Sequence, residues 1–525
     1  MTDTRHQDMW MGVDLGTQGV RVLVVTDDGK VVGRGSAPLT GHRDDGRHEQ
    51  LPAHWWDGVG AAARQALRTL PAERVRGLAV CGTSGTVLLT DSRGEPVTPA
   101  LMYDDARAGA EARDAQEAGA DVWRALGHRI QPTWALAKLL WLHRAGRGDG
   151  SEGPDARGGG GRRAGGDGGG GGARVCHQAD FITRRLVGHP VPADSSHALK
   201  TGYDVLHRAW PTEVLDRLGL SGLDFPAVTA PGTRLGTVCR AAAEATGLAE
   251  GTPVIAGMTD GCAAQLGSGA WGVGRWNTVL GTTLVLKGVT ADPLHDPAGV
   301  LYNHLSPDGN WLPGGASSVG AGVLSSAFPG ADLHRLDRLA AGREPASVLA
   351  YPLVSRGERF PFLAAEAEAF LTGPPADDAD HHAALLQGVA LAERLCLAYV
   401  RLLGAPVEEP VTFTGGATRS PYWNQLRADV LGLPARIPEH TDSALGMAVL
   451  AAYGVRRASG GGGTRAGAPA AALADLAGMV RVRTVLDPRP EVRRRFDQPF
   501  AELVGELERR GWLPSETAAY AREHG

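Results

Sequence analysis

Cysteine and lysine are both scarce in this chain of 525 residues. The five cysteines contain no CxxC pair and are odd in number, a pattern that fits neither a disulfide framework nor a zinc site. Their usage indicates a reducing, cytoplasmic compartment. Four lysines stand against forty-nine arginines, and glycine and alanine are abundant. We attribute this bias to genome composition rather than to a functional patch.

A long apolar run and an excess of positive charge are also absent. The polar start MTDTRHQD has no basic stretch followed by an apolar one, and nowhere do about 18 apolar residues follow one another. We therefore expect neither secretion nor a membrane partner. The net charge of -5 argues against nucleic acid as a partner and leaves a small neutral or anionic substrate open.

Several nucleotide and metal motifs are missing as well. The phosphate-loop signature GxxxxGK[ST] does not occur, which excludes a P-loop NTPase. A GxGxxG pattern at 267–272 follows a predicted helix rather than a strand, so we interpret it as a helix end and loop. The seventeen histidines show no HExxH or other metal-ligand spacing.

The length of the chain predicts two domains, because single hydrophobic cores stop growing at roughly 250 to 300 residues. We place the boundary at residues 250 and 251, giving domains 1–250 and 251–525. The glycine-rich stretch 145–173 cannot bury enough apolar surface to offset its ordering entropy, so we expect a disordered surface insertion there. The stretch 459–470 has the same composition.

Strand-like and helix-like segments alternate outside these stretches, which predicts an α/β fold. Strands are expected at 76–80, 252–257 and 409–415, and helices at 51–70 and 382–404. The run WNTVLGTTLVLKGVT at 276–290 then repeats the pattern of the chain's opening, an apolar strand, a Gly-Thr turn and a second apolar strand. This echo predicts two similar halves that face one another across a ligand-binding cleft.

The opening run MWMGVDLGTQGVRVLVV, residues 9–25, predicts a β-hairpin that leads into a third strand. The backbone N–H groups of the turn GTQG, from Gly16 to Gly19, and the Thr17 hydroxyl are suited to a polyphosphate. Asp14 would repel phosphate, so a bound nucleotide requires this carboxylate to act through Mg²⁺ and its waters. An ordinary hairpin whose polar residues serve only the turn remains the alternative.

Two later segments also carry functional and structural interpretations. Asp260 follows an apolar strand and starts a small-residue helix, where it is suited to accept a proton from a substrate hydroxyl or simply to cap the helix. Gly415 and Gly416 end a strand ahead of a helix that starts near Pro421, which allows close approach of adenine or a tight turn.

A third segment contains side chains suited to a polyol. Ser84, Asp105 and Arg107 can hydrogen-bond sugar hydroxyls. The alternative for Asp104 and Asp105 is capping of a helix that begins at about Ala106.

The order of the motifs is more specific than any one of them. DLGTQG, YDDAR, DSSHALKTGYDVLHRAW, GMTDGCAAQLGSG, VLGTTLVL, FTGGATRSPYWNQLRADVLG and SALGMAVLAAYG follow one another. This order resembles the FGGY carbohydrate kinases of the actin-like ATPase superfamily over roughly residues 9–455. The resemblance implies two actin-like, ribonuclease H-like domains that flank a central cleft, with ATP and Mg²⁺ as cofactors and a small-molecule sugar as substrate.

The resemblance also assigns residues. Asp14, Thr17 and Gln18 match the first phosphate and metal turn, with Asp14 reaching the metal through water. Asp260 matches the catalytic base that also contacts the sugar. The cofactor-binding positions of the second half are Gly281, Thr282 and Thr283 in the second phosphate turn, and Gly415, Gly416, Ser420 and Trp423 in the adenosine segment.

Departures from the family pattern bear on the substrate. Xylulose kinases of this family usually carry Gln-Met-His-Gly where this chain has GTSG at 82–85, so Ser84 replaces their substrate-contacting histidine. The usual Trp-x-Asp-x-Arg is YDDAR here, with Asp105 and Arg107 as the sugar-binding positions. Both segments resemble the D-ribulose kinase branch of xylulokinase-like proteins. We therefore expect D-ribulose as the substrate, with D-xylulose or another polyol as the alternative.

A different class, a non-metabolic actin-like ATPase such as a chaperone or filament protein, also shares this superfamily. No separate peptide-binding domain follows the two halves, which argues against a chaperone. The helical C-terminal segment 484–525 is expected to pack back on the domains. We expect a monomer or homodimer.

Overall fold

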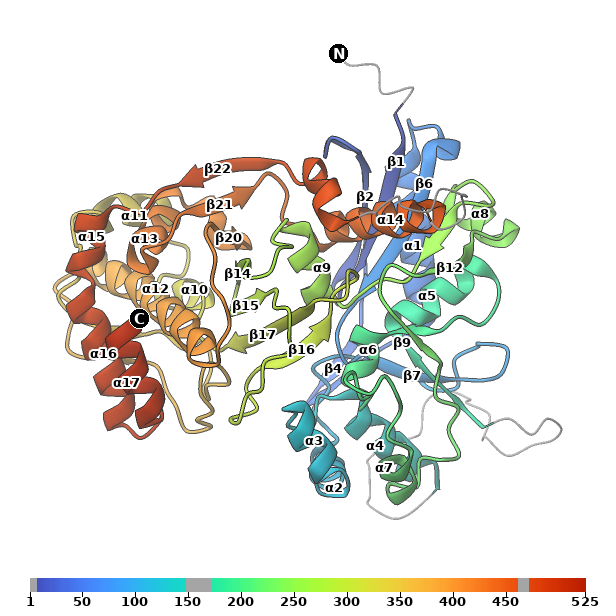
Figure 1. Cartoon of the computed structure of the whole chain (residues 1–525), viewed down its shortest axis with the longest axis horizontal. Helices are drawn as coiled ribbons and strands as arrows, with labels where there is room; N and C mark the ends of the chain where they lie inside the picture. Colours follow the sequence, from blue (N-terminus) through green and yellow to red (C-terminus); the bar gives the residue numbers. More distant parts are fainter. Residues whose placement is uncertain (1–6, 148–171, 461–471) are drawn as a thin grey trace. The chain divides into compact units, whose positions relative to one another are not determined.

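The computed structural model describes residues 7–147, 172–460 and 472–525. The stretches expected as insertions, 145–173 and 459–470, lie almost entirely outside the described residues. The chain forms two compact units (Figure 1). Unit 1 comprises Met1–Ala263 and Ser443–Ala471, and unit 2 comprises Ala264–Asp442 and Ala472–Gly525. The return of the segment after Ser443 to unit 1 has no signal in the sequence.

Unit 1 is built on a six-stranded sheet in the order β12-β13-β6-β1-β2-β3. The opening run forms the predicted hairpin: β1 and β2 are antiparallel, β2 and β3 are antiparallel, and β6 lies parallel to β1. β13 lies parallel to β6. The strands are β1 (Met9–Leu15), β2 (Gly19–Thr26), β3 (Val31–Pro38), β6 (Val75–Gly82), β12 (Arg234–Thr237) and β13 (Pro253–Ile255).

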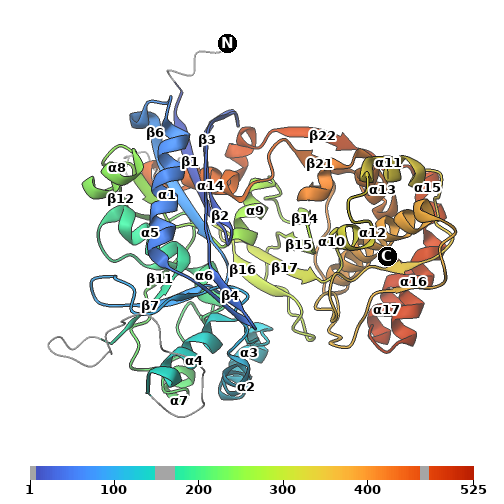
Figure 2. The ribbon, with the colours of Figure 1, turned by 180° about the vertical axis from the view of Figure 1, so that it is seen from behind.

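Helices cover both faces of this sheet, which explains why every residue of β1 is buried. α14 (Ser443–Gly460) packs on β1 and β6, in front of the sheet in Figure 1. α1 (Pro52–Leu67) packs on β2 and β3 and lies in front in the reverse view of Figure 2. Gly12 allows α14 to approach closely, because a Cβ there would lie 1.7 Å from the Ala444 carbonyl oxygen.

The rest of unit 1 comprises a second sheet and further helices and short strands. Its five-stranded sheet has the order β4-β5-β8-β7-β9, with strands β4 (His42–Asp44), β5 (Arg47–Gln50), β7 (Val87–Thr90), β8 (Ala100–Leu101) and β9 (Arg174–His177). The helices and short strands are η2 (Ala72–Arg74), α2 (Gly109–Ala118), α3 (Ala120–Leu126), α4 (Ala135–Arg147), α5 (Gln178–Val187), β10 (Ala193–Asp194), α6 (Ser195–Leu199), α7 (Thr212–Arg217), β11 (Val228–Thr229) and α8 (Arg240–Thr246). α9 (Asp260–Gly267) follows β13.

Unit 2 repeats the strand pattern of unit 1, as the echo in the sequence predicts. Its sheet has the order β16-β17-β15-β14-β20-β21-β22. β14, β15 and β17 are antiparallel neighbours, and β20 and β21 continue the sheet parallel to β14. The strands are β14 (Trp276–Leu280), β15 (Leu284–Gly288), β16 (Tyr302–Leu305), β17 (Trp311–Ser317), β20 (Val411–Thr414), β21 (Ala435–Pro438) and β22 (Val482–Leu486).

The helices of unit 2 include the C-terminal segment, which packs back on its own unit as expected. α16 and α17 contact α12, and α15 contacts α13. The remaining elements are α10 (Gly322–Ala327), α11 (Leu333–Ala340), β18 (Ala350–Tyr351), β19 (Phe370–Leu371), α12 (Asp378–Leu402), η3 (Gly416–Arg419), α13 (Pro421–Leu431), η4 (Leu473–Met479), α15 (Pro490–Arg495), α16 (Asp497–Arg509) and α17 (Ser515–His524).

Among the described residues, α12 alone is long and apolar enough to cross a membrane. It is buried within unit 2, in the same hydrophobic core as β14 and β20. The core helix of a globular protein has these properties.

Candidate functional site

Three predicted site segments of unit 1 follow neighbouring parallel strands of its main sheet. Leu15, at the end of β1, lies opposite Gly82, at the end of β6. Gly82 in turn forms a parallel bridge with Thr259, the residue before Asp260. The first phosphate turn, the GTSG segment and the predicted base therefore start at one edge of the sheet, where the carboxyl ends of parallel strands commonly bind ligands.

Asp14 is buried in this edge, with 6 % of its surface exposed. The Cys81 thiol donates to Asp14 Oδ1 over 3.5 Å, and Arg21 Nη1 lies 3.5 Å from Oδ2. Burial raises the pKa of the Cys81 thiol well above its ordinary value, and the charges of Asp14 and Asp260 raise it further. The two carboxylates thus act on the same buried thiol.

The turn after Asp14 differs in one detail from the expectation that all its amides face phosphate. The Gly16 N–H donates to the Gly19 carbonyl over 3.0 Å and closes the turn. The N–H groups of Thr17 and Gln18 have no backbone acceptor among the described residues, and they remain the phosphate-facing candidates. Gln50 stabilises the turn, because its Nε2 donates to the Thr17 carbonyl over 2.7 Å. This hydrogen bond was not predicted from the sequence.

Asp260 begins α9, and its Oδ1 accepts a hydrogen bond from the Gly261 N–H over 2.7 Å. The backbone ahead of it is fixed by Ser196, whose hydroxyl oxygen accepts from the Thr259 N–H over 2.8 Å. Ser196 in turn donates to Asp194 Oδ1 over 2.6 Å. The position of Asp260 therefore depends on the start of α6.

The run that contains Asp194, Ser196 and His197 belongs to the motif order above, but no single residue of it was singled out. His197 is buried, and its Nδ1 lies 2.6 Å from Asp194 Oδ2. The Asp-x-x-His spacing at a helix start is the signal that identifies this pair in the sequence. Gln178, at the start of α5, was also missed, although its side chain binds the GTSG segment at the Thr83 N–H.

The predicted sugar-binding residues have different surroundings. The Ser84 hydroxyl is buried and has no hydrogen-bond partner among the described residues. The Asp105 carboxylate already has partners within the protein. It accepts a hydrogen bond from the His48 N–H over 2.9 Å and pairs with Arg107 at 2.7 Å. Arg107 also pairs with Glu49 and stacks on Trp141, with Cζ 4.4 Å from the ring centroid.

The capping interpretation of Asp104 and Asp105 is wrong. The helix that follows, α2, begins at Gly109 rather than Ala106, and no side chain caps it. Asp104 pairs instead with His48 Nδ1 at 2.6 Å and with Arg43. The residues 104–108 form the link between β8 and α2 and hold β5 in place.

Lys138, in α4, is an unusual neighbour of this segment. Its side chain is fully buried, and Nζ donates to the Met102 carbonyl over 2.7 Å. Burial lowers the pKa of Lys138 to about 7, against the favourable charge of Asp105.

Lys138 is expected to make the free energy of unfolding rise with pH. Its pKa is 10.5 when exposed, so between about pH 7 and about pH 10 the unfolded chain binds a proton that the folded chain does not. The free energy of unfolding should increase across this window by about 1.4 kcal/mol per pH unit. Urea unfolding of the wild type and of Lys138→Met between about pH 7 and about pH 9 measures the difference. Parallel pH dependences of the two proteins would contradict the prediction.

In unit 2 the second phosphate turn and the adenosine segment are neighbours. Val279 lies opposite Thr414 in the sheet, so Gly281 and Gly415 follow adjacent strand ends. Gly415 has a φ of +88°, and a Cβ there would lie 2.5 Å from the Leu280 carbonyl oxygen. Only glycine fits this position.

The turn at Gly281, like the turn at Gly16, is closed by a backbone hydrogen bond from its first glycine, but over two residues rather than three. The Gly281 N–H donates to the Thr283 carbonyl over 3.1 Å. A third segment, missed in the sequence, supports the turn: the Gly322 N–H donates to the Thr282 carbonyl over 3.0 Å. The small residues SVGAG after β17 are the signal for this segment, because a Cβ on Gly320 would lie 2.2 Å from the Thr282 oxygen.

Ser420 and Trp423 serve the fold of the adenosine segment. The Ser420 hydroxyl caps α13 by accepting from the Trp423 N–H over 3.0 Å, and it donates to Asp337 over 2.7 Å. Trp423 is buried, and its Nε1 donates to the Leu386 carbonyl over 3.0 Å. The backbone of Gly415 and Gly416 is left as the surface suited to a nucleoside.

The donor set of unit 1 fits magnesium better than a tightly held metal. No group of three or more His, Cys, Asp or Glu side chains suited to a metal occurs in the part of the chain that the structure describes. Mg²⁺ keeps several waters and uses one or two carboxylates together with substrate phosphates. A single buried carboxylate, Asp14, beside a turn with open amides matches this pattern.

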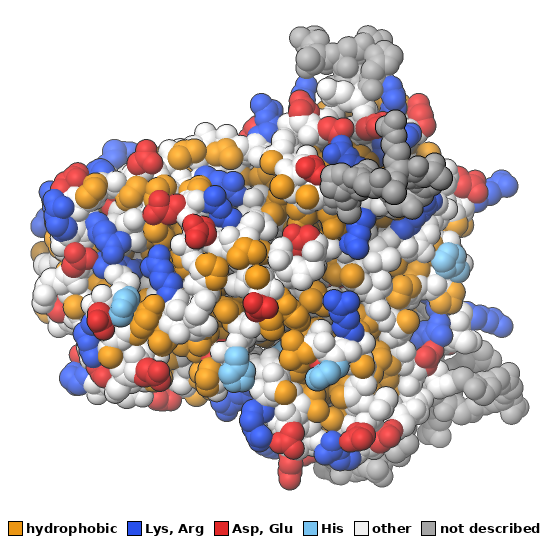
Figure 3. All heavy atoms as spheres, in the orientation of Figure 1, with side chains coloured by type: hydrophobic (Ala, Val, Ile, Leu, Met, Phe, Trp, Pro, Cys, Tyr) orange, Lys and Arg blue, Asp and Glu red, His pale blue; other side chains and the backbone are white. Residues whose placement is uncertain are grey.

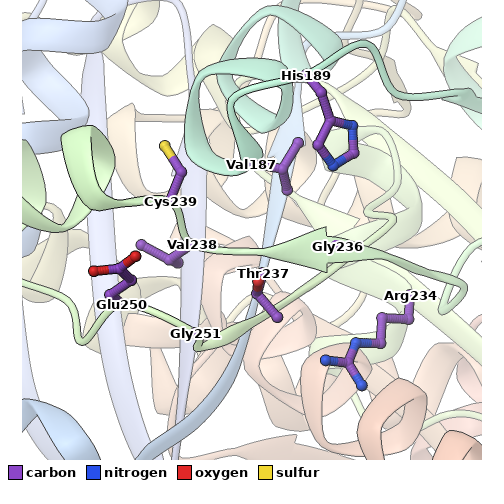
Figure 4. A pocket seen from close by; sticks show the side chains of 9 residues that line it. All are labelled: Val187, His189, Arg234, Gly236, Thr237, Val238, Cys239, Glu250 and Gly251. Atoms are coloured by element: carbon purple, nitrogen blue, oxygen red, sulfur yellow. The ribbon is translucent and has the colours of Figure 1, made fainter.

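A separate cavity of about 490 Å³ lies at the edge strand β12 of unit 1 (Figure 4). His189, Arg234 and Glu250 are among its lining residues. None of the predicted site residues lines it.

On the face in Figure 3, described Lys and Arg side chains are interspersed with Asp and Glu rather than gathered in one patch.

Comparison with known proteins decides the family. Residues 9–267 match the N-terminal domain and residues 276–455 the C-terminal domain of the FGGY family of carbohydrate kinases. The chain belongs to this family. It is a sugar kinase, a sugar phosphotransferase that acts on a small-molecule sugar and ATP. The interpretation as a non-metabolic ATPase is thereby set aside.

Individual FGGY relatives align along most of the chain. A xylulose kinase from Streptomyces coelicolor is 30% identical over 84% of this chain and 87% of its own. An autoinducer-2 kinase from Photorhabdus laumondii is 28% identical over 85% and 86%. The crystal structure of a xylulose kinase from Rhodospirillum rubrum superposes with a TM-score of 0.77 at 26% identity, over 95% of this chain and 99% of that one. The two actin-like, ribonuclease H-like domains expected from the sequence are therefore present.

Proposed function

We propose that this FGGY kinase transfers the γ-phosphate of ATP to the terminal hydroxyl of a ketopentose, with D-ribulose preferred over D-xylulose. The observation that carries the sugar assignment is Ser84, two residues after the end of β6, in the place of the histidine that xylulose kinases usually carry. Its buried hydroxyl has no partner among the described residues and is free to bind a sugar hydroxyl. D-xylulose is the second candidate, because several relatives are named xylulose kinases.

Asp260 acts as the general base in this proposal. Its carboxylate takes the proton of the terminal hydroxyl as the oxygen attacks the γ-phosphorus in line, and the bond to the β-phosphate oxygen breaks. The Gly261 N–H donates to Oδ1 of this carboxylate and fixes its orientation at the start of α9.

The phosphate turns stabilise the transferring charge. The amides of Thr17 and Gln18 in unit 1, and the turn from Gly281 to Thr283 in unit 2, donate to phosphate oxygens. Asp14 would hold Mg²⁺ through water, and the metal would neutralise phosphate charge. Gly415 and Gly416 accommodate the adenosine.

A sugar panel tests the substrate. We expect kcat/KM, measured by coupled detection of ADP, to be highest for D-ribulose among D-ribulose, D-xylulose, ribitol and glycerol. Ser84→His should move the preference toward D-xylulose by about tenfold, since one hydrogen bond of about 1.4 kcal/mol is at stake. Ser84→Ala is the matched control that removes the hydroxyl without adding an imidazole. A clear wild-type preference for D-xylulose or glycerol would overturn the assignment.

A further inference from the structure

Two histidine–aspartate pairs of the same construction lie side by side in unit 1. His177 Nδ1 is 2.6 Å from Asp180 Oδ2, and His197 Nδ1 is 2.6 Å from Asp194 Oδ2. The centroids of the two imidazole rings are 6.1 Å apart, and both side chains are buried.

The pairs differ at the second ring nitrogen. His177 Nε2 is hydrogen-bonded to the Thr201 hydroxyl at 2.8 Å. His197 Nε2 has no hydrogen-bond partner in the part of the chain that the structure describes. A buried polar atom without a partner destabilises the fold, so one that persists indicates a ligand or a water.

Gln178, whose side chain also lies against Gly82, has a second such atom. Its Oε1 accepts from both the N–H and the hydroxyl of Thr83, each over 2.8 Å. Its Nε2 has no partner among the described residues. A Cβ on Gly82 would lie 3.1 Å from Gln178 Oε1 and 3.3 Å from His197 Nε2, so both side chains meet at this glycine.

Both atoms can donate. Burial by itself lowers the pKa of His197, but the Asp194 carboxylate raises it overall, which favours the ring with protons on both nitrogens, in which Nε2 donates. Gln178 is left with its NH₂ group, which only donates. Two donors match an oxygen atom that only accepts hydrogen bonds, such as a carbonyl oxygen. A hydroxyl fits less well, because its own hydrogen also needs an acceptor.

Gly82 lies beside the predicted base in the sheet, through its bridge to Thr259. A molecule bound at Gly82 is therefore within the site that contains Asp260. The charge of Asp260 also contributes to the raised pKa of His197.

We propose that His197 and Gln178 bind the C2 carbonyl oxygen of an open-chain ketose and so distinguish a ketose from the corresponding alditol. This inference rests on the proposed ketopentose kinase activity. It assigns a specificity-determining role to two residues outside the phosphate turns.

The variant that isolates the contact is His197→Asn. The asparagine amide takes the place of Nδ1 and keeps the bond to Asp194, while the Nε2 donor is removed. We expect KM for D-ribulose to rise about 10- to 100-fold, as for loss of a charge-assisted hydrogen bond. KM for ATP and kcat/KM for ribitol, in which the carbonyl is a hydroxyl, should change by less than about threefold.

Two further variants keep the test decisive. Thr201→Val removes the partner of His177 Nε2 in the neighbouring pair, and it should leave the ratio of kcat/KM for D-ribulose to that for ribitol unchanged. Gln178→Glu keeps the acceptor for Thr83 and replaces the NH₂ donor by an oxygen. It should lower that ratio even if His197→Asn does not fold.

The possible outcomes separate the two proposals. A wild-type enzyme that phosphorylates no ketopentose overturns the proposed function and this inference with it. A wild type that phosphorylates D-ribulose, together with variants at His197 and Gln178 that keep the ketose-to-alditol ratio, overturns the inference alone. That second result would mean that the two donors hold only a water molecule.

Discussion

Asp260→Asn is expected to lower kcat by about 10²- to 10⁴-fold, the range that a positioned general base contributes. The amide has almost the same shape as the carboxylate and accepts the Gly261 N–H in the same way. It cannot take the proton of the attacking hydroxyl. The measurement is kcat with saturating D-ribulose and ATP, with ATP affinity determined separately by calorimetry.

Asp121→Asn is the matched control, because that carboxylate also belongs to unit 1 but is 93% exposed. We expect wild-type kcat from it. Asp260→Asn with unchanged kcat would contradict the assigned base. Loss of ATP affinity together with kcat would instead assign Asp260 to the nucleotide and its metal.

Arg427→Met is expected to lower the free energy of unfolding by about 3–5 kcal/mol, the effect of leaving a buried charge without its partner. Arg427 and Glu393 are fully buried and joined by two hydrogen bonds of 2.7 and 2.9 Å. Arg427 also donates to Thr278 over 2.6 Å and lies 3.8 Å from the centroid of Phe413. It therefore joins α13, α12, β14 and β20.

Urea unfolding of the variant gives the change in free energy. Replacing both charged residues, in Arg427→Met with Glu393→Met, should cost less than Arg427→Met alone, because no unpaired charge remains. Arg240→Met is the control for an exposed ion pair: Arg240 and Glu244 are 81% and 68% exposed, so we expect a change below about 0.5 kcal/mol. Equal effects of Arg427→Met and Arg240→Met would refute the prediction.

The local elements followed from sequence patterns because each pattern has a local physical cause. The apolar run around GTQG predicted the hairpin of β1 and β2, and the repeat at 276–290 predicted β14 and β15. The helix-like segments 51–70 and 382–404 correspond to α1 and α12. The start of α2 was misplaced because two consecutive aspartates suggested a cap, whereas they bind His48 and Arg107 from distant and nearby parts of the chain.

The candidate site was predictable only where a residue type carries its own chemistry. Asp14 and Asp260 stand out as carboxylates at or after the ends of apolar strands. Gly415 and Gly416 stand out as a glycine pair after a strand. Gln178 does not stand out, because a buried polar residue in a sequence looks like any other until its partners are known, and the Asp-x-x-His spacing marks His197 only as a partner of Asp194. Thr83 is the partner of Gln178 and Asp194 is the partner of His197, and only the folded chain shows which atom of each side chain is left over.

By itself, the sequence determined the α/β class, the duplicated hairpin and the resemblance to carbohydrate kinases, because these depend on periodicity and on motifs of a few neighbouring residues. The tertiary structure decided that residues after Ser443 return to unit 1, that Gly12 lies against α14, and that Gly82, Gln178 and His197 meet. These contacts join residues far apart in the chain. Strand order and helix packing create them, and no local pattern encodes either.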